Sequence, residues 1–174
     1  ASGSGTATAT ATVTQPTVVN LGTSVAGNIT CAVPSVSVTA NASGGTSPYS
    51  FSWSNGDTGN PAEYFDPGQH TVTVTDNNGC IKTAVFNINA NTVPPVSVAG
   101  PAGNLTCTQT QTSLNGTGSS TGGNIAYLWT ASNGGAILSG AQTLSPTVAG
   151  SGFYDLVITD LSNGCVANDV VEVA

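Results

Sequence analysis

The chain has 174 residues, of which 39% are hydrophobic and only 5% are charged, with a single basic residue and a net charge of −7. An ordinary soluble protein carries about 25% charged residues. One lysine cannot replace the counterions of a nucleic acid or of an anionic membrane surface, so neither is expected as a partner.

Residues 1–17 contain an alternating segment, TATATATVTQP, that belongs to neither of the repeats that follow. It is either the end of a preceding repeat in a longer array or a strand donated to the sheet of a neighbouring copy. An isolated Thr/Ala strand buries too little surface to hold itself in place, and unpaired sheet edges are templates for pairing. The candidate polymerisation strand is Thr6, Ala7, Thr8, Ala9, Thr10, Ala11, Thr12 and Val13.

Residues 18–93 form the first predicted module, in which apolar side chains recur with a period of two. Tyr49, Phe51 and Trp53 alternate with serines, and Val72 and Val74 alternate with threonines. This period, bounded by Gly, Asn and Pro turns, is typical of strands with one buried and one hydrated face. No helical period is present.

Residues 94–174 form a second module that repeats the first. Asn28-Ile29-Thr30-Cys31 recurs as Asn104-Leu105-Thr106-Cys107, and Asn78-Gly79-Cys80 recurs as Asn163-Gly164-Cys165. An insertion of about eight residues is expected within Ser132–Ser145, because the offset between the copies grows from 76 residues at Trp53 and Trp129 to 84 residues at Asp76 and Asp160. The sequence Val93-Pro94-Pro95-Val96 marks a semi-rigid boundary between the modules.

The aromatic strand is predicted to lie in the core of each module. Phe51 and Trp53 match Tyr127 and Trp129 in the second copy, whereas Tyr49 matches Ile125. Exchanging Tyr for Ile keeps apolar bulk but loses the ring, as a core position tolerates and a sugar-stacking position does not. The predicted fold is therefore all-β, with two tandem immunoglobulin-like β-sandwich modules and an extra N-terminal strand.

Four cysteines without nearby histidines favour disulfides over a zinc site and indicate an oxidising, extracellular compartment. The repeat suggests one bond per module, Cys31 with Cys80 and Cys107 with Cys165; pairing across modules is the alternative. Each loop of about fifty residues would contribute at most about 4 kcal/mol on the chain-entropy model. We further expect a mature chain or an excerpt of a longer one.

The motifs SPYSFSWSNGDTG and GQHTVTVTDNNGC resemble the SprB-type and PKD-like repeats of Bacteroidetes cell-surface proteins. The resemblance covers most of the first module, and the second keeps the cysteines, Trp129 and Asp160. Cys80 lies in a turn after its strand, so this is not a true antibody domain. The resemblance implies secreted adhesins or surface fibres that are built of many tandem modules.

Three patterns that are typical of catalytic sites are better explained by structure. Gly118–Gly122 matches the G-x-S-x-G nucleophile elbow but lacks a helix, and His70 lies in the other module, where Tyr154 is its counterpart. Glu63 and Asp66 lie in a Pro-bounded connection without a counterpart. We therefore predict no enzyme activity.

Asp76, Asn78 and Asp160 are weak candidates for calcium ligands, but a turn-initiating role is favoured because neither loop carries repeated acids. No cofactor is otherwise expected. Asn28, Asn41, Asn104 and Asn115 each begin an N-x-Ser/Thr sequon and are candidate glycosylation sites.

The sequence thus favours a structural subunit or repeat segment of a secreted filament or adhesin, with copies of itself or neighbouring repeats as partners. The alternative is a carbohydrate-binding or accessory module that uses a loop such as Ser132–Ser145 to contact surface glycans. Exposed loop aromatics would favour this alternative, and Tyr64 with Phe65 is the only such pair in the first module.

Overall fold

The computed structural model describes residues 5, 7–11, 15–101 and 103–174, which form strands, turns and loops without a helix. The chain divides into two compact units. Unit 1 contains Ser37–Tyr64, Gly68–Asn87 and the described residues up to Ala26; unit 2 contains Gly27–Val36, Phe65–Pro67 and Ile88–Ala174. The segment Gly27–Val36, which the sequence assigns to the first module, thus packs with the second.

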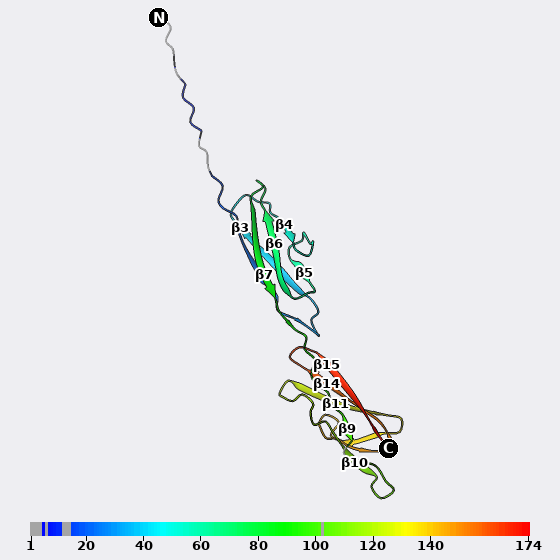
Figure 1. Ribbon diagram of the computed structural model, residues 1–174. Coiled ribbons are helices and arrows are strands. Elements are labelled where there is room, and N and C mark those ends of the chain that lie inside the picture. The colour runs from blue at the N-terminus through cyan, green and yellow to red at the C-terminus, as the bar shows by residue number, and fades with distance from the viewer. Residues whose placement is uncertain (1–4, 6, 12–14, 102) are drawn as a thin grey trace. The chain divides into compact units, whose positions relative to one another are not determined.

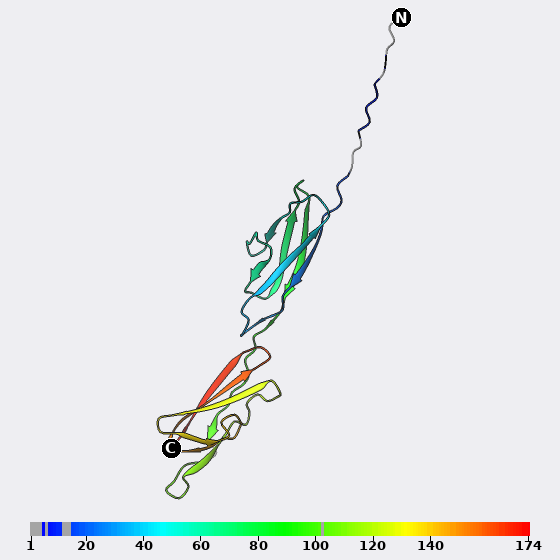
Figure 2. The ribbon, with the colours of Figure 1, turned by 180° about the vertical axis from the view of Figure 1, so that it is seen from behind.

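Unit 1 is built from two three-stranded sheets (Figure 1). One sheet has the order β1-β3-β5, with strands Asn20–Val25, Val36–Ser43 and Ala62–Tyr64. The other has the order β4-β6-β7, with strands Ser50–Trp53, Gly68–Thr75 and Ile81–Ile88. Figure 2 shows β3 crossing the strands β6 and β7 of the second sheet.

Unit 2 also contains two main sheets. In one of them β14 and β15 lie side by side (Figure 1). The order β12-β13-β10-β9 joins Ala136–Ser139, Thr147–Ala149, Gln111–Asn115 and Gly100–Pro101. The order β11-β14-β15 joins Ile125–Ser132, Gly152–Asp160 and Val166–Val173. A short parallel pair, β2 with β8, joins Ile29–Thr30 and Ala90–Asn91.

These strand orders are those of an immunoglobulin-like sandwich, in which the first, second and fifth strands face the third, sixth and seventh. The insertion in the second copy supplies β12, which pairs with β13 and widens that sheet to four strands. The all-β fold with two β-sandwich modules is confirmed. Its physical basis is the period-two alternation. In β6 this alternation buries Val72 and Val74 and leaves the neighbouring threonines exposed or half-exposed.

A tryptophan anchors the corresponding loop in each unit. The indole N–H of Trp53 donates to the Gly59 carbonyl at 2.7 Å, and that of Trp129 donates to the Thr143 carbonyl at 2.9 Å. Both indoles are buried, so these bonds satisfy a donor that would otherwise be costly to bury. Phe51 and Tyr127, two residues earlier on their strands, are half-buried.

Replacement of Trp129 by Ala is expected to lower the free energy of unfolding by about 3–5 kcal/mol, because it removes a large buried side chain and leaves a cavity. Leu128 is the matched control: it is 47% exposed on the same strand. Leu128→Ala should change the free energy by only about 0.5 kcal/mol. Urea unfolding measures both, and equal losses would contradict the burial of Trp129.

Candidate functional site

The candidate site is a disulfide between Cys31 and Cys165. Their Cα atoms are 5.0 Å apart, and their sequence separation is 134 residues. Cys80 and Cys107 are exposed and free. The predicted pairing of one bond per module is therefore wrong. The cross-module alternative is correct for one pair of cysteines.

Strand topology explains why the two cysteines of one repeat do not pair. The turn that carries Cys80 lies beside the loop after β3, because Asp76 in that turn binds the backbone N–H of Thr46. Cys31 instead precedes β3, whose eight residues span about 26 Å at 3.3 Å per residue. A disulfide needs Cα atoms within about 7 Å, so the two ends of one strand cannot be bridged.

Hydrogen bonds from the backbone and from one side chain hold the cysteine segments together in unit 2. The Ala32 N–H donates to the Asn163 carbonyl at 3.1 Å. The buried Asn163 amide donates to Asn91 Oδ1 at 3.2 Å and to the Val93 carbonyl at 3.1 Å. We call this arrangement, with Cys31 and Cys165, the joint.

Gly164 is required at the joint for two reasons. Its φ of +72° lies in the left-handed region, and a Cβ on it would lie 2.5 Å from the Cβ of Ala32. The close approach of the two segments therefore depends on a residue without a side chain. Cys165, which follows it, is only 1% exposed.

Asp76, a weak calcium candidate, organises a turn. It is 4% exposed, and its carboxylate accepts hydrogen bonds from the backbone N–H groups of Thr46, Asn78 and Cys80 at 2.7–3.0 Å. Desolvation raises the pKa of Asp76, but the bonds from Thr46, Cys80 and Asn78 outweigh it, so the pKa lies below its ordinary value. The contacts match the turn-initiating role.

Asp160 has the equivalent place in the second copy. Its carboxylate accepts from the Ser162 hydroxyl at 2.6 Å and the Ser162 N–H at 2.8 Å, and these bonds lower its pKa. Among the described residues no group of three or more His, Cys, Asp or Glu side chains could hold a metal ion. Asn78 directs its amide to the Thr46 hydroxyl at 2.8 Å.

The side chains considered for catalysis are dispersed. His70 lies in an aromatic cluster, with ring centroids 4.5 Å from Tyr64 and 5.8 Å from Phe86. The hydroxyl of Ser120, the serine of the G-x-S-x-G match, accepts from the Val96 N–H at 2.8 Å. Ser120 therefore fastens a backbone segment. Glu63 and Asp66 are exposed.

The candidate modification sites and the donor strand are at the surface where they are described. Asn28, Asn41, Asn104 and Asn115 are all exposed. In the candidate polymerisation strand, Ala7, Thr8, Ala9, Thr10 and Ala11 are exposed and belong to no strand, whereas Thr6, Thr12 and Val13 lie outside the described residues.

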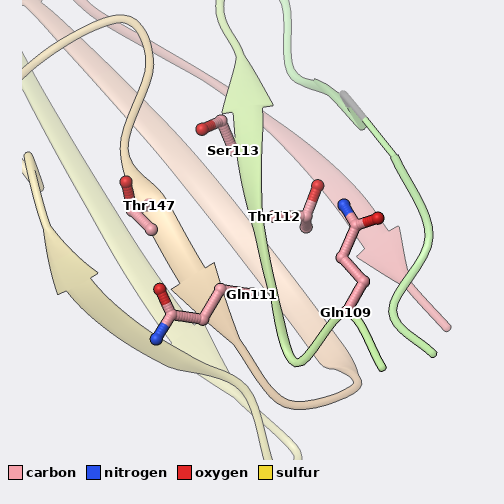
Figure 3. A pocket seen from close by; sticks show the side chains of 5 residues that line it. All are labelled: Gln109, Gln111, Thr112, Ser113 and Thr147. Carbon is pink, nitrogen blue, oxygen red and sulfur yellow. The ribbon is translucent and has the colours of Figure 1, made fainter. Parts of the chain in front are cut away.

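The expectation for a glycan-binding surface is only partly met. Tyr64 is buried, so the predicted pair of exposed aromatics is wrong, and only Phe65 of the pair is exposed, at 69%. The insertion loop contributes β12 and the carbonyl that anchors Trp129. A polar hollow of about 340 Å³ lies instead along β10 and β13, lined by Gln109, Gln111, Thr112, Ser113 and Thr147 (Figure 3).

Ala32 and Asn163 belong to the joint but were not predicted from the sequence. Strand order is the signal that could have revealed the joint. Cys31 precedes β3 and Cys80 follows β6, and these two positions lie at opposite ends of an immunoglobulin-like sandwich. Among the described residues no helix is long and apolar enough to cross a membrane.

No protein-family model and no curated protein matches the chain. Among solved structures, it is similar to the crystal structure of the N-terminal eight Ig domains of Down Syndrome Cell Adhesion Molecule isoform 1.30.30, with a TM-score of 0.42 and 10% identity. That match covers 91% of this chain but only 25% of the other, so the chain spans about a quarter of the structure's length.

Replacement of both Cys31 and Cys165 by Ser is expected to lower the free energy of unfolding by up to about 5 kcal/mol, the chain-entropy value for so long a loop. The control Cys80→Ser removes an exposed, free thiol and should have little effect. Urea unfolding and mass mapping of unreduced peptic peptides measure the two effects. Peptides linking Cys31 to Cys80 would contradict the joint.

Asp76→Asn should destabilise unit 1 at neutral pH and flatten its acid unfolding. Because the folded pKa of Asp76 lies below its ordinary value, its ionised carboxylate stabilises the fold above the unfolded pKa of about 3.9. That stabilisation is lost as the pH falls through the folded pKa. Thermal unfolding between pH 2 and 7 tests this, with Glu172→Gln, which removes an exposed carboxylate, as the control.

Proposed function

We propose that the chain is a structural subunit, or a repeat segment, of a secreted cell-surface filament or adhesin related to the SprB-type and PKD-like repeats. Its copies join head to tail, with residues 6–13 as a donated strand. The observation that carries this proposal is the joint, because a bond between distant segments of a two-module chain serves a mechanical purpose.

The joint limits how far the chain can be pulled out. Force applied at the flanks of this segment passes from Cys31 through the disulfide to Cys165, so residues 32–164 carry no extension. Without the bond, a separation of 134 residues would add roughly 450 Å of extended chain at about 3.4 Å per residue. A fibre under tension benefits from this limit on chain extension. The disulfide also suits an oxidising, extracellular setting.

Exposed sheet edges and an exposed N-terminal segment support head-to-tail joining. Ala7–Ala11 are exposed and in no strand, and alternating Thr and Ala suit addition to a sheet edge. Unit 1 offers β1 and β5 as edges of one sheet, and unit 2 offers β9 and β12. A head-to-tail contact that does not close into a ring produces a filament.

The second candidate function is glycan binding, and the polar hollow of Figure 3 is the observation in its favour. Its amides and hydroxyls could bind sugar hydroxyls. The lining contains no aromatic side chain on which a sugar ring could stack. The structural function is therefore preferred.

Negative-stain microscopy of the natively purified chain, beside a variant that lacks residues 1–13, tests the proposal. The variant keeps Thr17, whose carbonyl and hydroxyl both accept from the Gly45 N–H, so that unit 1 retains this contact. Filaments are expected from the full chain and not from the variant. Single particles from both, at every concentration, would sink the proposal of self-assembly.

A further inference from the structure

Two of the four cysteines form the joint, and their counterparts in the repeat are exposed thiols. Cys107 is the counterpart of Cys31, and Cys80 is the counterpart of Cys165. We propose that Cys107 of one copy forms a disulfide with Cys80 of the next copy, so that the contact between copies reproduces the joint within unit 2. This inference rests on the proposed function, since it names a bond between head-to-tail copies.

The turn that carries Cys107 has the same backbone structure as the turn that carries Cys31. In the joint, the Thr30 N–H donates to the Val33 carbonyl at 2.8 Å, and the Val33 N–H donates to the Thr30 hydroxyl at 3.0 Å. In the free turn, Thr106 and Gln109 make the same two bonds, both at 2.9 Å. One half of a second joint is therefore preformed.

The turn that carries Cys80 likewise matches the turn of Cys165. The Asp76 N–H donates to the Cys80 carbonyl at 3.0 Å, and the Asp160 N–H donates to the Cys165 carbonyl at 2.9 Å. The glycines before the two cysteines both have positive φ, +84° at Gly79 and +72° at Gly164. The backbone of the other half of the joint is therefore also present, and the amide of Asn78, the counterpart of Asn163, donates to the Thr46 hydroxyl.

The difference between the two glycines shows what the free turn lacks. A Cβ on Gly164 would overlap Ala32, whereas a Cβ on Gly79 would have no atom within 4 Å. The turn of Cys80 therefore has the glycine that a close approach requires, but no other segment of the described chain lies against that glycine. In the proposed contact Thr108 of the copy that supplies Cys107, the counterpart of Ala32, lies against Gly79 of the copy that supplies Cys80.

The surface beside Cys80 suits an incoming segment. A groove of about 430 Å³ is lined by Gln15, Pro16, Thr17, Val18, Val19, Cys80, Ile81 and Lys82. Val18 and Ile81 in this lining are apolar and are 76% and 67% exposed. On the other half, Gln109 borders the polar hollow two residues after Cys107 (Figure 3). Covering the groove beside Cys80 would bury the apolar side chains of Val18 and Ile81 next to the new bond.

The occupant is a second copy because the joint unites two unlike turns. A Thr-Cys turn meets an Asn-Gly-Cys turn, and each copy keeps one of each kind unpaired. When each copy bonds two different neighbours, such a contact is heterologous and propagates into a chain of copies; a covalent product that stops at a reciprocal dimer would overturn the inference. The segment Cys80–Cys107 would then run through each copy as part of one covalent thread.

Bond formation requires an oxidant, and a disulfide-exchange partner such as oxidised glutathione supplies it. The Cys107 thiolate attacks the oxidant disulfide, forms a mixed disulfide and releases one thiolate. The Cys80 thiolate of the next copy then attacks the Cys107 sulfur and releases the second thiolate. Two protein thiols are oxidised, one small disulfide is reduced to two thiols, and the two protein protons go to the released thiolates or to water.

The test incubates the full chain with oxidised glutathione and resolves it by electrophoresis without reductant. A ladder of covalent oligomers is expected from the natural chain, and mass mapping of a mixture of ¹⁵N-labelled and unlabelled copies should find Cys80–Cys107 peptides with one partner of each label. Cys80→Ser and Cys107→Ser should each remain monomeric, and an equal mixture of the two should yield dimers only.

A matched pair of glycine variants tests whether the contact resembles the joint. Gly79→Ala should lose the ladder because the new methyl group meets Thr108 of the bonded neighbouring copy, as a methyl on Gly164 would meet Ala32. Gly56→Ala is the control: Gly56 has a similar φ of +88° and open space around it, but it lies in another turn. Circular dichroism of both variants verifies folding, and an unimpaired ladder from a folded Gly79→Ala variant would overturn the proposed geometry.

Homotypic Cys80–Cys80 or Cys107–Cys107 bonds, a bond within one copy, or failure to form any bond would overturn the inference. The proposed function can fail separately. Filaments from a Cys80→Ser, Cys107→Ser double variant without a covalent ladder in the natural chain would leave the structural function standing and remove the disulfide between copies. A covalent ladder without filaments in the microscope would support the disulfide between copies and contradict the proposed function as a filament.

Discussion

The length of a β-strand separates the two cysteine-bearing turns of each repeat, and the arrangement of the disulfides follows from that separation. A strand of eight residues holds its ends about 26 Å apart, which no disulfide can span. Cys31, which precedes β3, therefore cannot bond to Cys80, whose turn lies beside the loop after β3. Cys31 finds Cys165, and the same rule leaves Cys80 and Cys107 without partners within their own sandwiches.

The joint in unit 2 is polar and tightly packed, unlike the hydrophobic core of that unit. Its specificity comes from the Asn163 amide, which satisfies two backbone or side-chain acceptors, and from Gly164, which lets Ala32 approach. The chain carries few charges, so ion pairs contribute little, and hydrogen bonds with a covalent bond do the positioning instead. Such contacts respond weakly to salt, which suits a protein outside the cell.

Much of the fold could be predicted from the alternation of side chains. Trp53 and Trp129 were expected inside, and they lie there with their indole N–H groups bound to carbonyls of the following loop. The turn role of Asp76 followed from the residues after it. Tyr64 was misplaced because a three-residue strand, β5, lies between Pro61 and Pro67, and its short alternation cannot be distinguished from a loop.

The sequence alone determined the class of fold, the two-fold repeat and the position of the insertion, because the period of two and the order of turn residues are local properties. The tertiary structure decided which cysteines meet, which unit takes Gly27–Val36, and which strand the insertion becomes. These outcomes depend on which ends of the strands lie together in space. A linear pattern of residues records the spacing along the chain and leaves that arrangement to packing.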